Sequence, residues 1–67
     1  MATTQKLINE LTWREVDANL APDTRRMLRE ERIALQAAAG SKNAAAIRTA
    51  TAEALRVANM WGVEIAR

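Results

Sequence analysis

The densest group of ionisable side chains in the sequence is the run RRMLREER at residues 25–32. On a helical wheel Arg25, Arg29 and Arg32 align on one face. Arginine suits phosphate recognition because its planar guanidinium donates two parallel hydrogen bonds. Such a stripe is a possible phosphate-binding face, although two adjacent glutamates interrupt its positive field. The first interpretation is therefore a solvated helix face, with ion pairs between arginine and glutamate.

Residue types alone make catalysis an unpromising function. The chain has no histidine, cysteine or tyrosine, so the usual nucleophile–base pairs and His/Cys metal sites cannot be assembled. Glu30 and Glu31 are the only adjacent carboxylates, and neighbours on a helix point about 100° apart. The two glycines, Gly40 and Gly62, make no phosphate-binding loop. We expect no enzyme, no metal and no cofactor.

Length and composition predict a small helical domain that associates with another chain. The 67 residues make one domain at most, and 15 of its 33 hydrophobic residues are alanines, which bury little area. Burying a large apolar side chain yields about 1.5–3 kcal/mol, against an ordering cost of about 1.5 kcal/mol per residue. Without cysteine no disulfide can make up the difference. We therefore expect residues 1–67 to form one domain that pairs as a homodimer.

Charge and hydropathy give weaker indications of location and packing. No apolar run approaches the ~20 residues of a membrane span, and the N-terminal stretch lacks a signal-peptide core. We therefore expect a cytoplasmic protein with no membrane contact. Residues 1–24 carry two positive and four negative charges, whereas residues 25–67 carry eight positive and four negative. This asymmetry predicts that the N-terminal piece packs on, or pairs with, the more basic remainder.

The clearest predicted element is an antiparallel helical hairpin spanning about 22–39 and 42–64. Pro22 suits the first turn of a helix, Gly40 has the position of a C-terminal cap, and Ser41 that of the next N-cap. The short connection requires the two helices to pack side by side. Their facing apolar stripes predict a core that includes Leu28, Leu35, Ile47, Ala54, Val57 and Trp61.

The N-terminal segment shows apolar residues on two opposite sides of a helical wheel. Leu7 and Leu11 share one side, and the other carries Trp13, Val16 and Leu20. The change of side falls at Thr12, which opens a Thr-x-x-Glu capping box with Glu15. Leu11 and Val16 also have the spacing of a hydrophobic staple. We predict a turn at Thr12, so that one or two short helices, the second ending near residue 19, precede the hairpin.

Several large apolar residues fall outside the predicted core and indicate a second buried surface. The candidates for a protein-binding or dimer interface are Trp13, Ile33, Leu55, Met60 and Val63. The fold that we expect is all-α, a dimeric bundle built on the hairpin. The expected function is that of a small binding protein, such as an adaptor, a chaperone-like subunit or an inhibitor. The alternatives are a DNA-binding regulator that uses the helix at 23–39, and an accessory structural subunit of a larger assembly.

Overall fold

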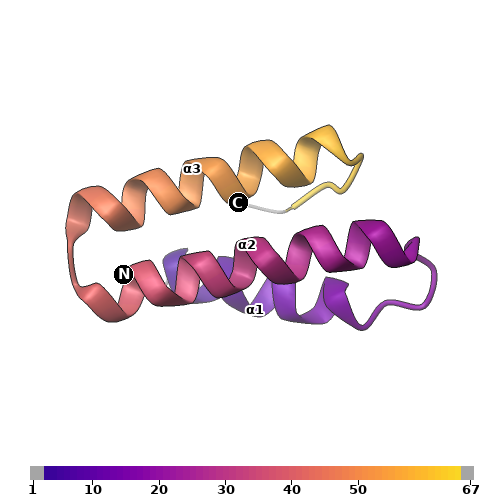
Figure 1. Ribbon diagram of the computed structural model, residues 1–67, viewed down its shortest axis with the longest axis horizontal. Coiled ribbons are helices and arrows are strands. Elements are labelled where there is room, and N and C mark those ends of the chain that lie inside the picture. Colours follow the sequence, from indigo (N-terminus) through magenta and orange to yellow (C-terminus); the bar gives the residue numbers. More distant parts are fainter. Residues whose placement is uncertain (1–2, 66–67) are drawn as a thin grey trace.

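A computed structural model describes residues 3–65 as three helices that run up, down and up (Figure 1). Helix α1 spans Thr3–Glu15, α2 spans Pro22–Ser41 and α3 spans Ala44–Met60. The all-α expectation is confirmed, and α2 and α3 form a helical hairpin. None of the described helices is both long and apolar enough to cross a membrane.

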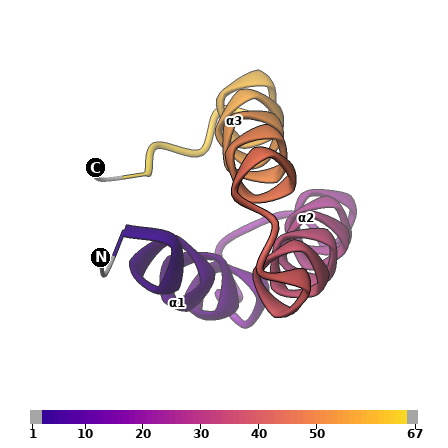
Figure 2. The same cartoon turned by 90° about the vertical axis from the view of Figure 1, so that its left-hand side faces the viewer.

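Helix α2 is the centre of the arrangement, because it packs along both of the other helices. Helices α1 and α3 contact each other at few residues, so the bundle is open along one side (Figure 2). The segment that follows α3 leaves its end and crosses toward α1 on this open side. The molecule is elongated, with extents of 34 × 19 × 18 Å.

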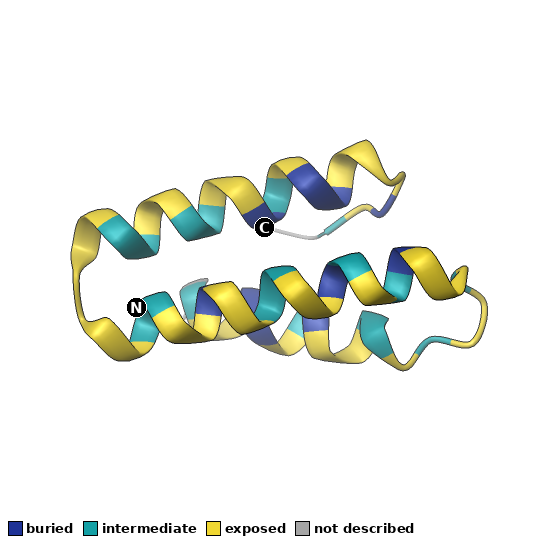
Figure 3. Ribbon diagram, viewed as in Figure 1, coloured by how far each residue is buried: buried dark blue, intermediate teal, exposed yellow. Residues whose placement is uncertain are grey.

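The core lies where the three helices face one another (Figure 3). Three leucines are fully buried in it: Leu11 from α1, and Leu28 and Leu35 from α2. Burial of each contributes on the order of 1.5–3 kcal/mol. The remaining buried apolar residues are Leu7, Ile8, Ala54, Val57, Ala58 and Val63. Small alanines on α3 permit its close approach to α2.

The turn predicted at Thr12 is wrong, because α1 continues unbroken to Glu15. The Thr12 hydroxyl donates a hydrogen bond of 2.8 Å to the carbonyl of Ile8, one turn earlier, instead of capping a new helix. The Glu15 carboxylate accepts two hydrogen bonds from Arg32 of α2. The continuous helix carries Leu7 and Leu11 in the core and, beyond Thr12, Glu15 against Arg32 of α2.

The predicted second helix reaching to residue 19 is also absent, because the chain turns directly after α1. The Asp17 carboxylate accepts a hydrogen bond of 2.9 Å from the backbone amide of Asn19. The amide of Leu20 donates to the Asp17 carbonyl at 3.1 Å. Aspartate favours such local bonds over helical ones. Helix α2 then begins at Pro22, as the sequence predicts.

The connection between α2 and α3 lies two residues later than predicted. Gly40 and Ser41 belong to α2, and the left-handed position that ends it is Lys42, with φ of 59°. Asn43 is the N-cap of α3, and its side chain accepts from the amides of Ala45 and Ala46 at 3.0 and 3.2 Å. Asparagine is among the strongest N-caps, and here it satisfies two amides at once.

Helix α3 ends at Met60, four residues earlier than predicted, in a Schellman motif. Gly62 adopts φ of 74°, its amide donates to Asn59, and the amide of Val63 donates to Ala58 at 2.8 Å. This reversal brings Val63 into the core next to Ala58. It also corrects the prediction that Trp61 is a core residue, since Trp61 is 42% exposed.

Candidate functional site

The most unusual surface of the described structure is a group of large apolar side chains at one end of the bundle. Helices α1 and α3 both end there, on the right in Figure 1. Trp13 and Val16, at the end of α1, are 74% and 69% exposed, and Met60, the last residue of α3, is 68% exposed. Trp61 follows directly. We call these four residues the apolar end.

The proposed interface residues fall in three different environments. Trp13 and Met60 belong to the apolar end, whereas Ile33 is exposed near the middle of α2. Leu55 is half-buried and packs against the core. Val63 presents little surface to a partner, because it is 6% exposed and packs in the core. The Schellman turn at Gly62, which reverses the chain, accounts for this correction.

The six residues predicted to form the core also differ in how deeply they are buried. Leu28, Leu35, Ala54 and Val57 are buried, and Ile47, near the start of α3, is half-buried. Trp61 lies past the end of α3, beyond the turn where the helical wheel no longer applies. The helical periodicity is therefore informative inside each helix and fails where the helix stops.

A groove of about 920 Å³ lies between α1 and α3. Its apolar wall includes Leu55, Val63 and Ile65, with Ala52 and Asn59 of α3 beside them. Its polar rim is formed by Glu10, Arg14, Arg56 and Glu64. The groove therefore combines an apolar wall with carboxylate, guanidinium and amide groups.

Arg14 links the two walls of this groove. Its Nε pairs with Glu10 at 3.0 Å within α1, and its Nη2 donates to the backbone carbonyl of Glu64 at 3.0 Å. This contact joins α1 to the segment after α3. A second, shallower hollow lies beside the groove and is lined by Glu10, Trp13, Arg14, Val16 and Asp17.

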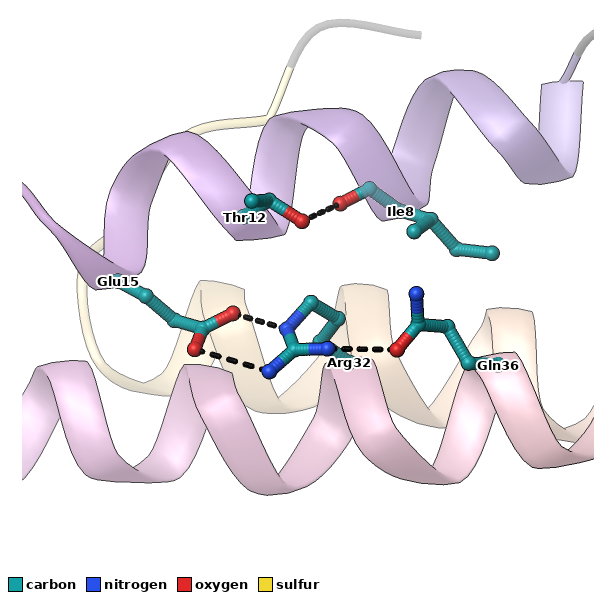
Figure 4. Close-up of polar contacts among 5 residues, drawn as sticks. All are labelled: Ile8, Thr12, Glu15, Arg32 and Gln36. Atoms are coloured by element: carbon teal, nitrogen blue, oxygen red, sulfur yellow. Dashed lines mark hydrogen bonds and ion pairs between the residues drawn. The ribbon is translucent and has the colours of Figure 1, made fainter.

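The arginine face of α2 is less available to phosphate than its sequence suggests (Figure 4). Both Nε and Nη2 of Arg32 donate to the Glu15 carboxylate of α1, and Nη1 donates to Gln36 at 2.5 Å. The bonded Glu15 carboxylate raises the pKa of Arg32 despite partial burial. Arg25 is half-buried, and its Nε has no hydrogen-bond partner among residues 3–65. Of the three, Arg29 alone is exposed.

The Glu15–Arg32 pair agrees with the expectation drawn from the charge asymmetry, since it ties an acidic side chain of the N-terminal piece to an arginine of α2. Arg26 pairs with Asp23 at 2.7 Å on the exposed surface and not with Glu30. A fork-to-fork arginine–carboxylate pair is directional, so Glu15–Arg32 also sets how α1 lies along α2.

Acidic and basic groups also meet across α2 and α3. Partial burial raises the pKa of Glu31, and the Glu53 and Glu30 carboxylates add to the rise while Arg56 opposes it. The hydrogen bonds from Arg56 lower the pKa of Glu53. This group is a surface charge network, and such exposed pairs contribute little to stability because solvent screens them.

Sequence reasoning missed Val16 as a surface residue and the Glu10–Arg14 pair as a groove rim. Val16 was assigned to a hydrophobic staple at the predicted turn. The detectable feature was the second apolar side of α1, which indicates either a turn or a helix with one face in the core and one on the surface. Comparison with protein-family models, with curated proteins and with solved structures found no match for the chain.

Proposed function

We propose that this chain is a small non-enzymatic protein that acts by binding another protein, as an adaptor, chaperone-like subunit or inhibitor does. The observation that carries the proposal is the apolar end, where Trp13, Val16, Met60 and Trp61 are exposed together. Tryptophan and methionine are enriched in protein interfaces and depleted from ordinary surfaces. Large apolar side chains exposed at the same end of a small protein favour an interaction site there.

The bifacial pattern of α1 supports the same proposal. One face supplies Leu7, Ile8 and Leu11 to the core, and a second, exposed face carries Trp13. The core does not need the second face, and an exposed tryptophan gains much apolar burial when a partner covers it. Two copies of the chain can cover part of this surface, so we include homodimer formation in the proposal.

The alternative of a DNA-binding regulator has less support. It depends on Arg25, Arg29 and Arg32, of which Arg32 is paired with Glu15 and Arg25 is half-buried. Affinity for duplex DNA rises with the number of phosphates that cations neutralise. The single exposed arginine of this set, Arg29, would contribute little affinity for DNA. The third alternative, an accessory structural subunit, would also use the apolar end.

The proposal is tested by capture from a lysate of the source cells with the tagged chain. We expect the captured proteins to survive nuclease treatment and to be lost with Met60→Glu, because a charge at the apolar end opposes burial. The matched control is Arg29→Glu, which should capture as the unaltered chain does. Circular dichroism should show the same helical content for both variants.

The reverse pattern would support the DNA-binding alternative. Capture that is lost after nuclease, together with salt-sensitive duplex binding that disappears in Arg29→Glu, would refute protein binding through the apolar end.

A further inference from the structure

A projecting tryptophan and a groove able to receive it lie side by side on one surface. The groove between α1 and α3 and the shallow hollow at Trp13 share two lining residues, Glu10 and Arg14. The two depressions are therefore contiguous, with this pair between them. Trp13 is 74% exposed on the far side of the pair.

The groove is large enough to admit a tryptophan side chain, and part of its lining, Leu55, Val63 and Ile65, is apolar. Its volume of about 920 Å³ is within the range of sites that hold small organic ligands, roughly 300–1,000 Å³. Leu55 and Ile65 are half-buried in its wall and pack against the core, so they hold their positions. The lining also includes Asn59 and Glu64, whose side-chain amide oxygen and carboxylate are of a type that accepts from an indole N–H.

The charges between the two depressions are self-complementary. Glu10 and Arg14 are one turn apart on α1, and each side chain is 34% exposed. When two copies meet about a two-fold axis, every contact occurs twice, with the roles exchanged. An axis beside this pair places Glu10 of each copy opposite Arg14 of the other, so acid faces base on both sides.

We propose that two copies of the chain form a two-fold dimer in which Trp13 of each copy occupies the α1–α3 groove of the other. Glu10 and Arg14 lie at the axis, and Val16 packs beside the tryptophan at the groove edge. This inference names one partner for the surface used in the proposed function, and it rests on that proposal only for the homodimer. It leaves Met60 and Trp61 outside the groove for a different protein.

Cysteine cross-linking tests this arrangement directly, because the natural chain has no cysteine. Two single variants, Val16→Cys and Asn59→Cys, are mixed and oxidised. We expect a covalent heterodimer, since Val16 of one copy lies at the groove of the other. The matched control pairs Val16→Cys with Ala45→Cys, an exposed position at the opposite end of α3, and should remain uncoupled.

Charge reversal tests the two-fold axis independently of any cysteine. Glu10→Arg places like charges together and should raise the dimer dissociation constant roughly tenfold or more. Adding Arg14→Glu restores opposite charges across the axis and should recover most of the affinity. Ile33→Glu, a charge on an exposed apolar site outside both depressions, should leave dimerisation unchanged while Trp13→Glu abolishes it.

The possible failures are distinguishable from failure of the proposed function. A dimer that couples through Ala45→Cys, or that Ile33→Glu disrupts, would overturn this arrangement and leave the homodimer intact. A chain that stays monomeric would overturn both the arrangement and the homodimer. Capture of another protein through Met60 is measured separately, so neither of these results decides whether the chain binds a different protein.

Discussion

The Thr12 side chain has two alternative uses, and the tertiary structure selects between them. A threonine followed three residues later by glutamate can begin a helix, or it can continue one by donating to the carbonyl a turn earlier. Here Thr12 donates to Ile8 and Glu15 pairs with Arg32. Local sequence favours both uses similarly. The long-range contacts of Leu11 and Glu15 with α2 decide the outcome, and a sequence pattern does not contain them.

Replacing Thr12 by alanine tests this assignment by the sign of its effect. Inside a helix, Thr12→Ala should stabilise the fold by about 0.5 kcal/mol, because alanine is the better helix former and the Thr12 side chain is exposed. The measurement is urea denaturation at fixed chain concentration. A loss of about 0.5–2 kcal/mol would instead be the effect of removing an N-cap, and it would contradict an unbroken α1.

Trp61 and Val63 illustrate another limit at this scale. On a helix continuing to residue 64, Trp61 falls on the apolar face and Val63 points away from it, so the sequence predicts Trp61 in the core and Val63 on the surface. The structure shows the opposite, because the chain reverses at Gly62 and this reversal buries Val63 and exposes Trp61. The glycine was visible in the sequence. Its left-handed conformation follows from contacts that the sequence pattern does not specify.

At the scale of the elements, helix ends are less predictable than helix existence. The hairpin and the start of α2 at Pro22 follow from periodicity and a fixed backbone angle. The end of α2 does not, because Gly40 continues the helix and Lys42 takes the left-handed conformation. Asn43 caps α3 in place of Ser41, so the turn lies two residues later than predicted.

The two glycines should therefore respond oppositely to alanine. Gly40→Ala should stabilise the fold by about 0.5–1 kcal/mol, because glycine weakens a helix interior and an added Cβ meets no atom within 4 Å. Gly62→Ala should cost on the order of 1–2 kcal/mol, because a side chain at φ of 74° is strained. Both values come from urea denaturation at one chain concentration.

Each glycine substitution serves as the control for the other, since both add one methyl group where space is open. Equal effects would contradict the assignment of Gly40 to a helix and Gly62 to a Schellman turn. A stabilising Gly62→Ala in particular would mean that α3 continues past Met60.

At the scale of the whole molecule, the sequence predicted contact between the N-terminal piece and the basic remainder, but neither that α2 makes this contact nor how α1 and α3 are disposed. The charge asymmetry indicated the first, and the Glu15–Arg32 pair agrees with it. The groove depends on α1 and α3 both lying against α2 while barely touching each other. No local pattern encodes that geometry, so its rim residues were not predictable.

The open side of the bundle accompanies an exposed area larger than the mass of the chain predicts. The chain exposes 4691 Å², whereas a monomeric protein of its mass typically exposes about 4,200 Å². Covering about 800 Å² on each copy is enough for a standard interface. Surplus surface of this kind accords with the proposed pairing of two copies, in which the exposed side of α1 meets the groove of a second chain.

Sedimentation equilibrium over a range of micromolar concentrations tests most directly whether another chain covers this surface. The account predicts a mass of about twice the 7.4 kDa of one chain, together with a melting temperature that rises with concentration. Trp13→Glu should sediment at the mass of one chain while remaining helical. A mass of 7.4 kDa for the unaltered protein at every concentration, with an unchanging melting temperature, would contradict the account.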